Sequence, residues 1–347
     1  MPTPPPARRL TIASALAALA GVALFVWLVR SVGVAQIWQG FRQIGWGLLA
    51  IVVLGGLRFA ARALAWTIAL DPPHRLRFRD AFNAVVCGDT LGNVMTLGPL
   101  VSEAAKLALV RSRVPLGPAF TALAIENLLY TLSVAAMIAA ATVALLFSFD
   151  LPDWLREFSE VALAGVAVLF AVTGWMFWRR PALVGSIPAL FRPGESSRLH
   201  GRLEKVRAVE HEIYSFASRR PGAVLPAIAA ELSFHALGVL EVHLTLWLIT
   251  GAPPPLLIAF IVEGFNRLIA VAFKIVPFQV GVGEGVTGWL TAVLGLGTAP
   301  GVTVSLARKV RMVIWSGVGT ALLVRQGLSA QALLKDAELT ADARPDV

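Results

Sequence analysis

Two arginines inside an apolar stretch are the first residues whose type and spacing could do chemistry. Arg58 and Arg62 lie in the apolar segment 44–70, and a spacing of four residues places them on one face of a helix. An arginine at the centre of a bilayer costs about 2.5–3.5 kcal/mol on insertion scales. The planar guanidinium group suits phosphate. The pair therefore predicts an anion site for a lipid phosphate. The alternatives are side chains that reach the membrane surface or pair with internal acids.

Charged residues recur in the other apolar segments and complete a candidate cavity site. Its expected members are Arg58, Arg62, Glu103, Lys106, Glu126, Glu231, His235, Arg267, Glu284, Arg308 and Arg311. Ionisable residues within membrane segments are functional candidates by default. Structural roles remain open for several: Glu103 can be an acid in the first turn of a helix, and Glu263 can form an ion pair with Arg267, four residues on.

The last apolar segment, 302–324, carries three neighbouring basic residues. Arg308 and Arg311 are three residues apart, so we expect both to face the same cavity, with Lys309 pointing elsewhere.

The same residues give no pattern that predicts a metal, a cofactor or a catalytic centre. Glu231 and His235 share a helix face, whereas Glu241 and His243 lie on others, and the spacing matches neither Glu-x-x-His nor His-Glu-x-x-His. A proton-linked pair or a structural hydrogen bond fits Glu231 and His235 better. The chain contains neither a Walker motif nor a G-x-S-x-G elbow. Cys87 is the only cysteine, which excludes an intrachain disulfide.

Two Gly/Pro breaks interrupt the apolar pattern, one in each half of the chain. The first lies in 81–100 and contains Gly98 and Pro99, and its flanks are basic on both sides. The second lies in 277–301; its hinge residues are Pro277, Gly281 and Gly283. Semi-polar backbone at membrane depth is tolerated where protein buries it. Paired interrupted segments in two halves point to a binding site near the bilayer midplane. We therefore expect two broken or re-entrant hairpins in two pseudo-repeated halves.

Composition identifies the elements that must position these residues as membrane helices. Of the 347 residues, 57% are hydrophobic and only 15% are charged, with a mean hydropathy of +0.73. Soluble domains carry about 25% charged residues, so a soluble enzyme and a disordered chain are excluded. We expect an all-α polytopic membrane protein with about 7–9 transmembrane helices. The net charge of +9 fits basic cytoplasmic loops, so no nucleic-acid partner is expected.

The pattern along the chain divides it into a short tail at each end and one membrane domain. Residues 1–9 are Pro-rich, basic and expected to be disordered and cytoplasmic; 10–325 form the membrane domain; and 326–347 are a polar tail. Within the domain, 10–178 is the first half, 179–221 a cytoplasmic linker and 222–325 the second half. The acidic stretch 148–160 is expected to be an external loop.

The linker carries one apolar stripe, which predicts an amphipathic helix on the cytoplasmic membrane surface. The stripe consists of Leu199, Leu203, Val206, Val209, Ile213 and Phe216.

The order of these motifs resembles the transmembrane region of lysylphosphatidylglycerol synthases, over roughly residues 10–325. The resemblance rests on the run Gly98-Pro99-x-x-x-Glu103-x-x-Lys106, then Glu126, then Pro277, Gly281, Gly283 and Glu284, and a span with Arg308 or Arg311. Two positions depart from the family pattern: Ser102 stands where Gly is usual, and Asn127 where a basic residue is common. The full synthases add an aminoacyl-transferase domain, which we do not expect in this chain.

The resemblance implies a multi-pass protein of the bacterial cytoplasmic membrane, with a cytoplasmic N-terminus, that moves a polar or anionic lipid between leaflets. Arg58, Arg62, Arg267 and Arg311 would attract the headgroup phosphate. Glu103, Glu126 and Glu284 would balance these charges or exchange protons. The expected partners are membrane lipids and enzymes of lipid synthesis. The alternatives are an intramembrane enzyme or accessory subunit in lipid, hopanoid or glycolipid biosynthesis, and an assembly partner docked through the amphipathic helix.

Overall fold

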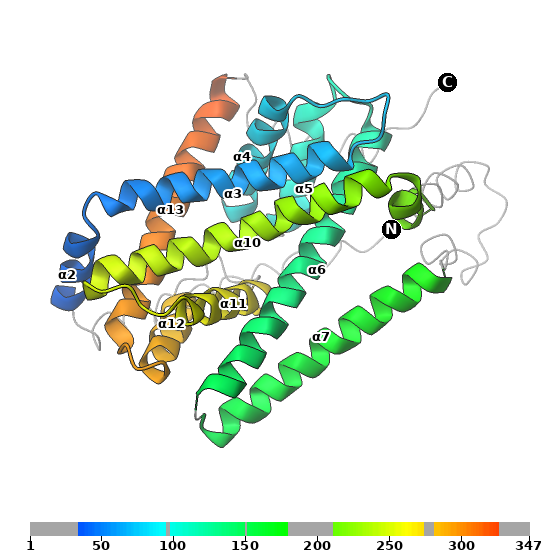
Figure 1. The fold of residues 1–347 in the computed structure, drawn as a ribbon. Coiled ribbons are helices and arrows are strands. Elements are labelled where there is room, and N and C mark those ends of the chain that lie inside the picture. The colour runs from blue at the N-terminus through cyan, green and yellow to red at the C-terminus, as the bar shows by residue number, and fades with distance from the viewer. Residues whose placement is uncertain (1–33, 95–97, 150, 180–210, 274–280, 326–347) are drawn as a thin grey trace, which may run out of the picture.

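A computed structural model describes residues 34–94, 98–149, 151–179, 211–273 and 281–325, which contain helices and no strand (Figure 1). The helices are α2 (Val34–Ile44), α3 (Gly47–Ala69), α4 (Phe78–Val94), α5 (Gly98–Val110), α6 (Leu116–Ser148), α7 (Asp153–Arg179), α10 (Pro221–Thr250), α11 (Leu256–Ala272), α12 (Val282–Val293) and α13 (Thr298–Arg325). Residues 211–219 are also helical. The predicted first span 10–29, Pro277, most of the linker and the tail lie outside the described residues.

Four helices of the described part are long and apolar enough to cross a membrane: α3, α6, α7 and α10. The all-helical polytopic class is therefore confirmed, while the number of crossings stays a prediction. Helix α7 stands apart from the bundle (Figure 1), and its apolar side chains are largely exposed. It begins at Asp153, so the predicted loop 148–160 is wrong in its second part. An acid in the first turn of a helix interacts favourably with the helix dipole, which fits this earlier start.

Helices α3 and α10 lie side by side and run in opposite directions through the centre of the bundle (Figure 1). At one end, Arg220 Nη1 donates to the carbonyl oxygen of Leu70, at 2.7 Å. At the other end, the start of α3 at Gly47 touches Leu248 near the end of α10. The two helices therefore define two opposite ends of the molecule.

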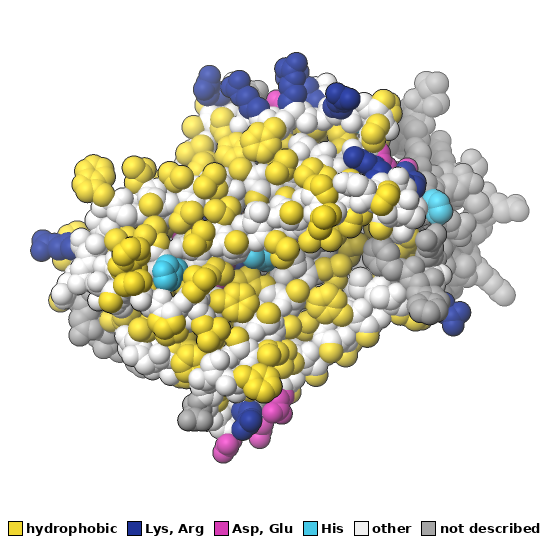
Figure 2. Space-filling model, viewed as in Figure 1, with side chains coloured by type: hydrophobic (Ala, Val, Ile, Leu, Met, Phe, Trp, Pro, Cys, Tyr) yellow, Lys and Arg dark blue, Asp and Glu magenta, His cyan; other side chains and the backbone are white. Residues whose placement is uncertain are grey.

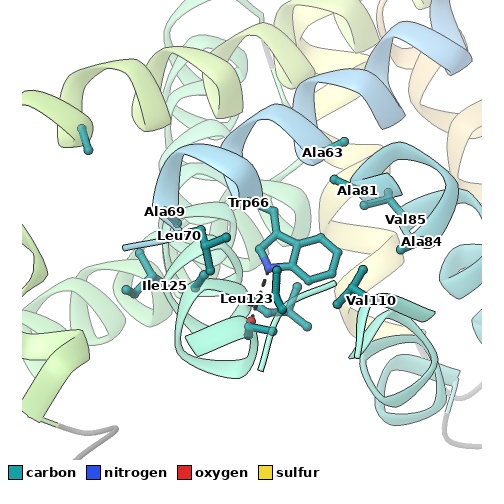
Figure 3. Packing of buried hydrophobic residues seen from close by; sticks show 14 of the residues in the cluster. Ala63, Trp66, Ala69, Leu70, Ala81, Ala84, Val85, Val110, Leu123 and Ile125 are labelled. Atoms are coloured by element: carbon teal, nitrogen blue, oxygen red, sulfur yellow. Dashed lines mark hydrogen bonds between the residues drawn. The ribbon is translucent and has the colours of Figure 1, made fainter. Parts of the chain in front are cut away.

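A hydrophobic cluster closes each end. The Trp66 cluster joins the end of α3 to the starts of α4, α6 and α10 and the end of α5 (Figure 3). Trp66 is 1% exposed, and its ring N–H donates to the carbonyl oxygen of Ala119, at 3.4 Å. The Leu246 cluster joins the ends of α6, α10 and α12 to the starts of α7 and α11. Burial of this apolar area fixes the helix ends, so the middle of the bundle is left for the charged side chains.

The described end of the linker belongs to the Trp66 cluster. Phe216 is 5% exposed and lies in the cluster, and Ile213 packs against it. The last two residues of the apolar stripe therefore pack on protein. The other four lie outside the described residues, so the position of the linker helix on the membrane surface stays a prediction.

Helices α4 and α5 form a short hairpin at the first Gly/Pro break. At 1.5 Å per residue, 17 and 13 residues reach about 25 and 20 Å, short of a hydrocarbon core of about 30 Å. A Cβ on Gly98 would overlap the carbonyl oxygen of Gly92, so glycine permits the close approach. Arg113 Nε lies 3.9 Å from Asp80 Oδ2, which places both outer ends of the hairpin together.

The packing of α3–α6 matches that of α10–α13, helix for helix. In this comparison α3, α4, α5 and α6 correspond to α10, α11, α12 and α13. Helix α3 packs on α4 and α6, and its counterpart α10 packs on α11 and α13. Helix α4 packs on α13, and its counterpart α11 packs on α6. The segments 34–148 and 211–325, which contain these helices, are of equal length.

Charged side chains gather at opposite edges of the surface (Figure 2). One edge, next to the Trp66 cluster, carries the exposed residues Arg75, Arg77, Arg79, Arg111 and Arg113. The other, at the start of α7, carries the exposed residues Asp153, Glu157 and Glu160. Basic residues collect on the cytoplasmic side of membrane proteins, so we expect the first edge to face the cytoplasm.

Candidate functional site

An arginine-rich network lies between the two hydrophobic clusters. We use this name for Arg58 of α3, Glu241 of α10, Glu263 and Arg267 of α11, and Arg308 and Arg311 of α13. The Glu263 side chain is 0% exposed. Its carboxylate accepts a hydrogen bond from Arg267 Nε at 2.9 Å, lies 3.5 Å from Arg58 Nη2, and pairs with Arg308. One carboxylate thus holds guanidinium groups from three helices.

Glu241 is the second carboxylate of this network, and it is 1% exposed. Arg58 Nη1 donates to its Oε2 at 3.2 Å, while Arg311 Nε and Arg308 Nε lie 3.1 and 3.6 Å from its Oε1. Two carboxylates therefore serve four guanidinium groups, which leaves a formal surplus of two positive charges.

Some polar atoms of the network make no hydrogen bond. The Nε atoms of Arg58, Arg308 and Arg311 are buried without one among the described residues. The same holds for Glu241 Oε1, which forms ion pairs with the last two arginines without hydrogen-bond geometry. Buried polar groups are normally hydrogen-bonded, and leaving one unpaired costs about 1–3 kcal/mol. The guanidinium carbons of Arg58 and Arg267 lie 4.4 and 5.1 Å from the centre of the Phe234 ring, whose face favours a cation. Guanidinium N–H groups with few acceptors can donate hydrogen bonds to an anion.

Two glycines make room for this network. A Cβ on Gly238 of α10 would overlap Glu263 Oε1, and a Cβ on Gly55 of α3 would lie 2.6 Å from Arg311 Cδ. Any side chain at either position would push the charged groups apart. The two glycines thus leave room for the present positions of Glu263 and Arg311.

A second group of charged side chains, the acidic network, lies one turn further along α3 than Arg58. It comprises Arg62, Asp89, Glu103, Lys106, Glu126, Asn127 and Glu231. Arg62 Nε donates to Glu126 Oε1 at 2.7 Å, and Arg62 Nη2 donates to Asn127 Oδ1 at 3.1 Å. Asn127 Nδ2 in turn donates to Glu103 Oε2 at 2.9 Å, and Lys106 Nζ donates to Glu103 Oε1 at 2.7 Å.

Two further acids face this network without an ion pair in the described part of the chain. Glu231 is 1% exposed, and neither of its oxygens has a hydrogen-bond partner there. Asp89 accepts a hydrogen bond from Asn93 and lies within electrostatic reach of Lys106 and Arg62, and also of Arg311 in the other network. Four carboxyl groups therefore share two cations, so the formal surplus is negative, opposite to that of the arginine-rich network.

Glu284 lies outside both networks, at the start of α12. Its Oε2 accepts a hydrogen bond from the backbone N–H of Gly281 at 2.9 Å, and its Oε1 pairs with Lys309. Gly281 has φ 83°, which favours glycine, and Gly283 follows in the first turn of the helix. Glu284 thus caps the helix and neutralises Lys309.

The structure brings most of the predicted site residues together but divides them differently. Arg58 and Arg62 share a helix face and yet enter different networks. Arg308 and Arg311 both reach Glu241, while Lys309 points to Glu284, as expected. His235 Nε2 lies 2.9 Å from Ser133 Oγ of α6, so it interacts there and not with Glu231.

Sequence reasoning missed Glu241 and treated Glu263 only as a partner for Arg267. Both are acidic residues in the middle of apolar helices. The same feature makes Glu126 a candidate site residue, so it could also have identified Glu241 and Glu263. Their central role depends on α3 and α13, which lie far away in the sequence.

The described residues contain no group of three His, Cys, Asp or Glu side chains able to hold a metal ion. A pocket lies elsewhere, where Gln39 and Gln43 of α2 meet Thr303 of α13. The charged side chains of the two networks instead contact one another.

Comparison with known proteins identifies the family of this chain. No curated protein and no solved structure matches the chain. A family model described as "Lysylphosphatidylglycerol synthase TM region" matches residues 12–318, which contain both networks and both breaks. The chain is therefore an integral membrane protein of the lysylphosphatidylglycerol synthase transmembrane-region family.

Proposed function

We propose that this protein moves a polar lipid with an anionic headgroup between the two leaflets of the cytoplasmic membrane. The observation that carries the proposal is the largely buried surplus of guanidinium groups, four against two carboxylates, in which Arg58 Nε has no hydrogen-bond partner among the described residues. Buried cations without sufficient counter-charge are costly unless an anion visits them. A lipid phosphate supplies that charge and accepts several hydrogen bonds from guanidinium groups.

The ion pairs of the network give the transfer a physical route. A phosphate that enters must compete with Glu241 or Glu263 for the same donors. Because Arg58, Arg308 and Arg311 each contact Glu241, one donor can change partner while the others hold the carboxylate. Exchange of this kind lowers the cost of taking a headgroup through the hydrocarbon layer, since the phosphate is never without hydrogen bonds.

The matching packing of α3–α6 and α10–α13 supports an inverted repeat, with α3 antiparallel to its counterpart α10. Under this arrangement the α4–α5 hairpin enters from the end with the Trp66 cluster, and α11 and α12 from the end with the Leu246 cluster. Inverted repeats allow one half to rock against the other around a central site. Such rocking would open the arginine-rich network to each leaflet in turn.

No chemical step by this chain is part of the proposal. Its partners are membrane lipids, and the enzymes that make those lipids would supply the substrate. The basic edge with Arg77 and Arg113 would face the cytoplasm, in keeping with a cytoplasmic-membrane protein.

The experiment is translocation of a fluorescent lipid in vesicles that contain the purified protein. Labelled phosphatidylglycerol in the inner leaflet should become accessible to an added quencher faster than in empty vesicles. Labelled phosphatidylcholine should move more slowly, because its choline cation opposes the positive network. Equal rates in empty and protein-containing vesicles would refute the proposal.

A further inference from the structure

Glu231 is a buried acid that the anion site does not use. It lies in the first half of α10, and both of its oxygens are buried without a hydrogen-bond partner in the part of the chain that the structure describes. An ionised carboxylate in such a place costs several kcal/mol unless it is paired. A carboxyl group that carries a proton avoids most of this cost.

The charged groups around Glu231 come from three other helices. Glu126 of α6, Arg62 of α3 and Lys106 of α5 act on it electrostatically. Arg62 already bonds to Glu126, and Lys106 to Glu103, so both nearby cations have anionic partners. On α10 itself, His235 lies one turn away but interacts with Ser133 and stacks on Tyr130. Of these neighbours, Glu126 repels a second negative charge and therefore favours a proton on Glu231.

With every carboxyl group ionised and no ligand bound, the two networks have opposite surpluses that balance when they are added. The arginine-rich network has four cations and two carboxylates, and the acidic network has two cations and four carboxyl groups. They meet on α3, where Arg58 and Arg62 are one turn, about 6 Å along the axis, apart. An anion in the first network and a proton in the second leave this balance unchanged. Either ligand alone disturbs it.

We propose that Glu231 binds a proton inside the bundle and that this proton crosses the membrane together with the anionic headgroup. This inference rests on the proposed function and names its coupling ion. The Glu231 carboxylate takes the proton from water on one side and returns it to water on the other, so no other reactant is needed. Headgroup binding and proton binding support each other because each offsets the charge of the other.

This coupling has a sharp thermodynamic signature. One proton and one singly charged headgroup move together without net charge. The distribution of labelled phosphatidylglycerol between leaflets should therefore shift about tenfold for each unit of pH difference. It should not respond to an imposed membrane potential, which acts only on net charge moved. If the anionic lipid moves without a proton, its distribution should respond to the membrane potential and ignore the pH difference.

The experiment measures this distribution in protein-containing vesicles, with a pH difference or a potassium diffusion potential imposed. Wild-type protein should follow the pH difference and ignore the potential. Glu231→Gln keeps the shape of the side chain and should abolish the response to pH. Glu160→Gln, at an exposed position on α7, is the matched control and should behave as wild type. If lipid moves but its distribution ignores the pH difference, or if Glu231→Gln still follows it, the coupling is refuted.

A second readout does not depend on transport. Infrared difference spectra between high and low pH should show the carbonyl stretch of a protonated carboxyl group that Glu231→Gln removes. Glu126→Gln should also remove it near neutral pH, because Arg62 then needs Glu231 as its anionic partner. An unchanged band in both variants would overturn the assignment of the proton to Glu231. If the band behaves as expected but no lipid moves above empty vesicles, the proposed function and its coupling fail while the proton site stands.

Discussion

At the scale of single residues, Glu263 shares its negative charge among three arginines, as Glu241 does. It is fully buried and pairs with Arg58, Arg267 and Arg308. Part of this was predictable, because the spacing of Glu263 and Arg267 already indicates an ion pair within one helix. The partners from α3 and α13 were not, since pairing between helices depends on tertiary packing that no local pattern records.

Replacement of Glu263 by Gln should therefore destabilise the fold strongly. Three buried guanidinium groups would lose a shared counter-charge, and breaking a buried ion pair from one side costs about 3–5 kcal/mol. Glu160→Gln removes an exposed acid that lies 3.9 Å from Arg156, and such pairs contribute about 0–1 kcal/mol. The measurement is the melting temperature of each variant in detergent, which should fall for Glu263→Gln and stay near the wild-type value for Glu160→Gln. Similar melting temperatures for both variants would show that Glu263 is not the centre of the network.

The α4–α5 hairpin illustrates what sequence reasoning reached at the scale of elements. The Gly/Pro break and the basic flanks of 81–100 predicted a hairpin with both ends on one side, and the contact between Arg113 and Asp80 agrees with it. The close packing of Gly98 on Gly92 was not predicted, because glycines in a break fit equally well with a loose turn. The segment beyond Asp153 was predicted as a loop from its acids, although an acidic first turn also suits a helix.

Gly98→Ala tests that packing. The added Cβ would overlap the carbonyl oxygen of Gly92, so the hairpin must open, at a cost of about 1–3 kcal/mol. Gly174→Ala on α7 is the matched control, because a Cβ there meets no atom of the described residues within 4 Å. The melting temperature should fall for Gly98→Ala alone. A drop of the same size in both variants would contradict the close approach.

At the scale of the whole molecule, the proposed inverted repeat has two halves of opposite direction around two networks of opposite charge. The repeated Gly/Pro breaks predict the two halves, and the clusters of basic residues predict which edge faces the cytoplasm; both stay predictions. The separation of Arg58 and Arg62 into different networks was beyond sequence reasoning. A shared helix face says nothing about which neighbouring helix supplies each partner.

Topology tests the inverted arrangement directly. Cys87 is buried and is the only cysteine, so Cys87→Ala gives a background for single added cysteines. Arg113→Cys lies at the outer end of the α4–α5 hairpin, and Ala252→Cys in the turn before α11; both positions are exposed. In intact cells, a thiol reagent that cannot cross membranes should label Ala252→Cys and spare Arg113→Cys until the membrane is opened. Labelling of both from outside would rule out hairpins that enter from opposite sides.

The claim that the surplus of guanidinium groups carries a lipid phosphate is tested most directly by removing one of them without leaving a carboxylate unpaired. Arg311→Gln does this, because Glu241 keeps Arg58 and Arg308. A hydrogen bond from a charged group contributes about 1.5–3 kcal/mol, which corresponds to roughly tenfold or more in rate.

The measurement is the rate of phosphatidylglycerol movement in vesicles, for wild type, Arg311→Gln and the exposed control Arg156→Gln. The account predicts that Arg311→Gln slows movement about tenfold or more at an unchanged melting temperature, while Arg156→Gln moves lipid at the wild-type rate. Movement at the wild-type rate by Arg311→Gln would contradict it.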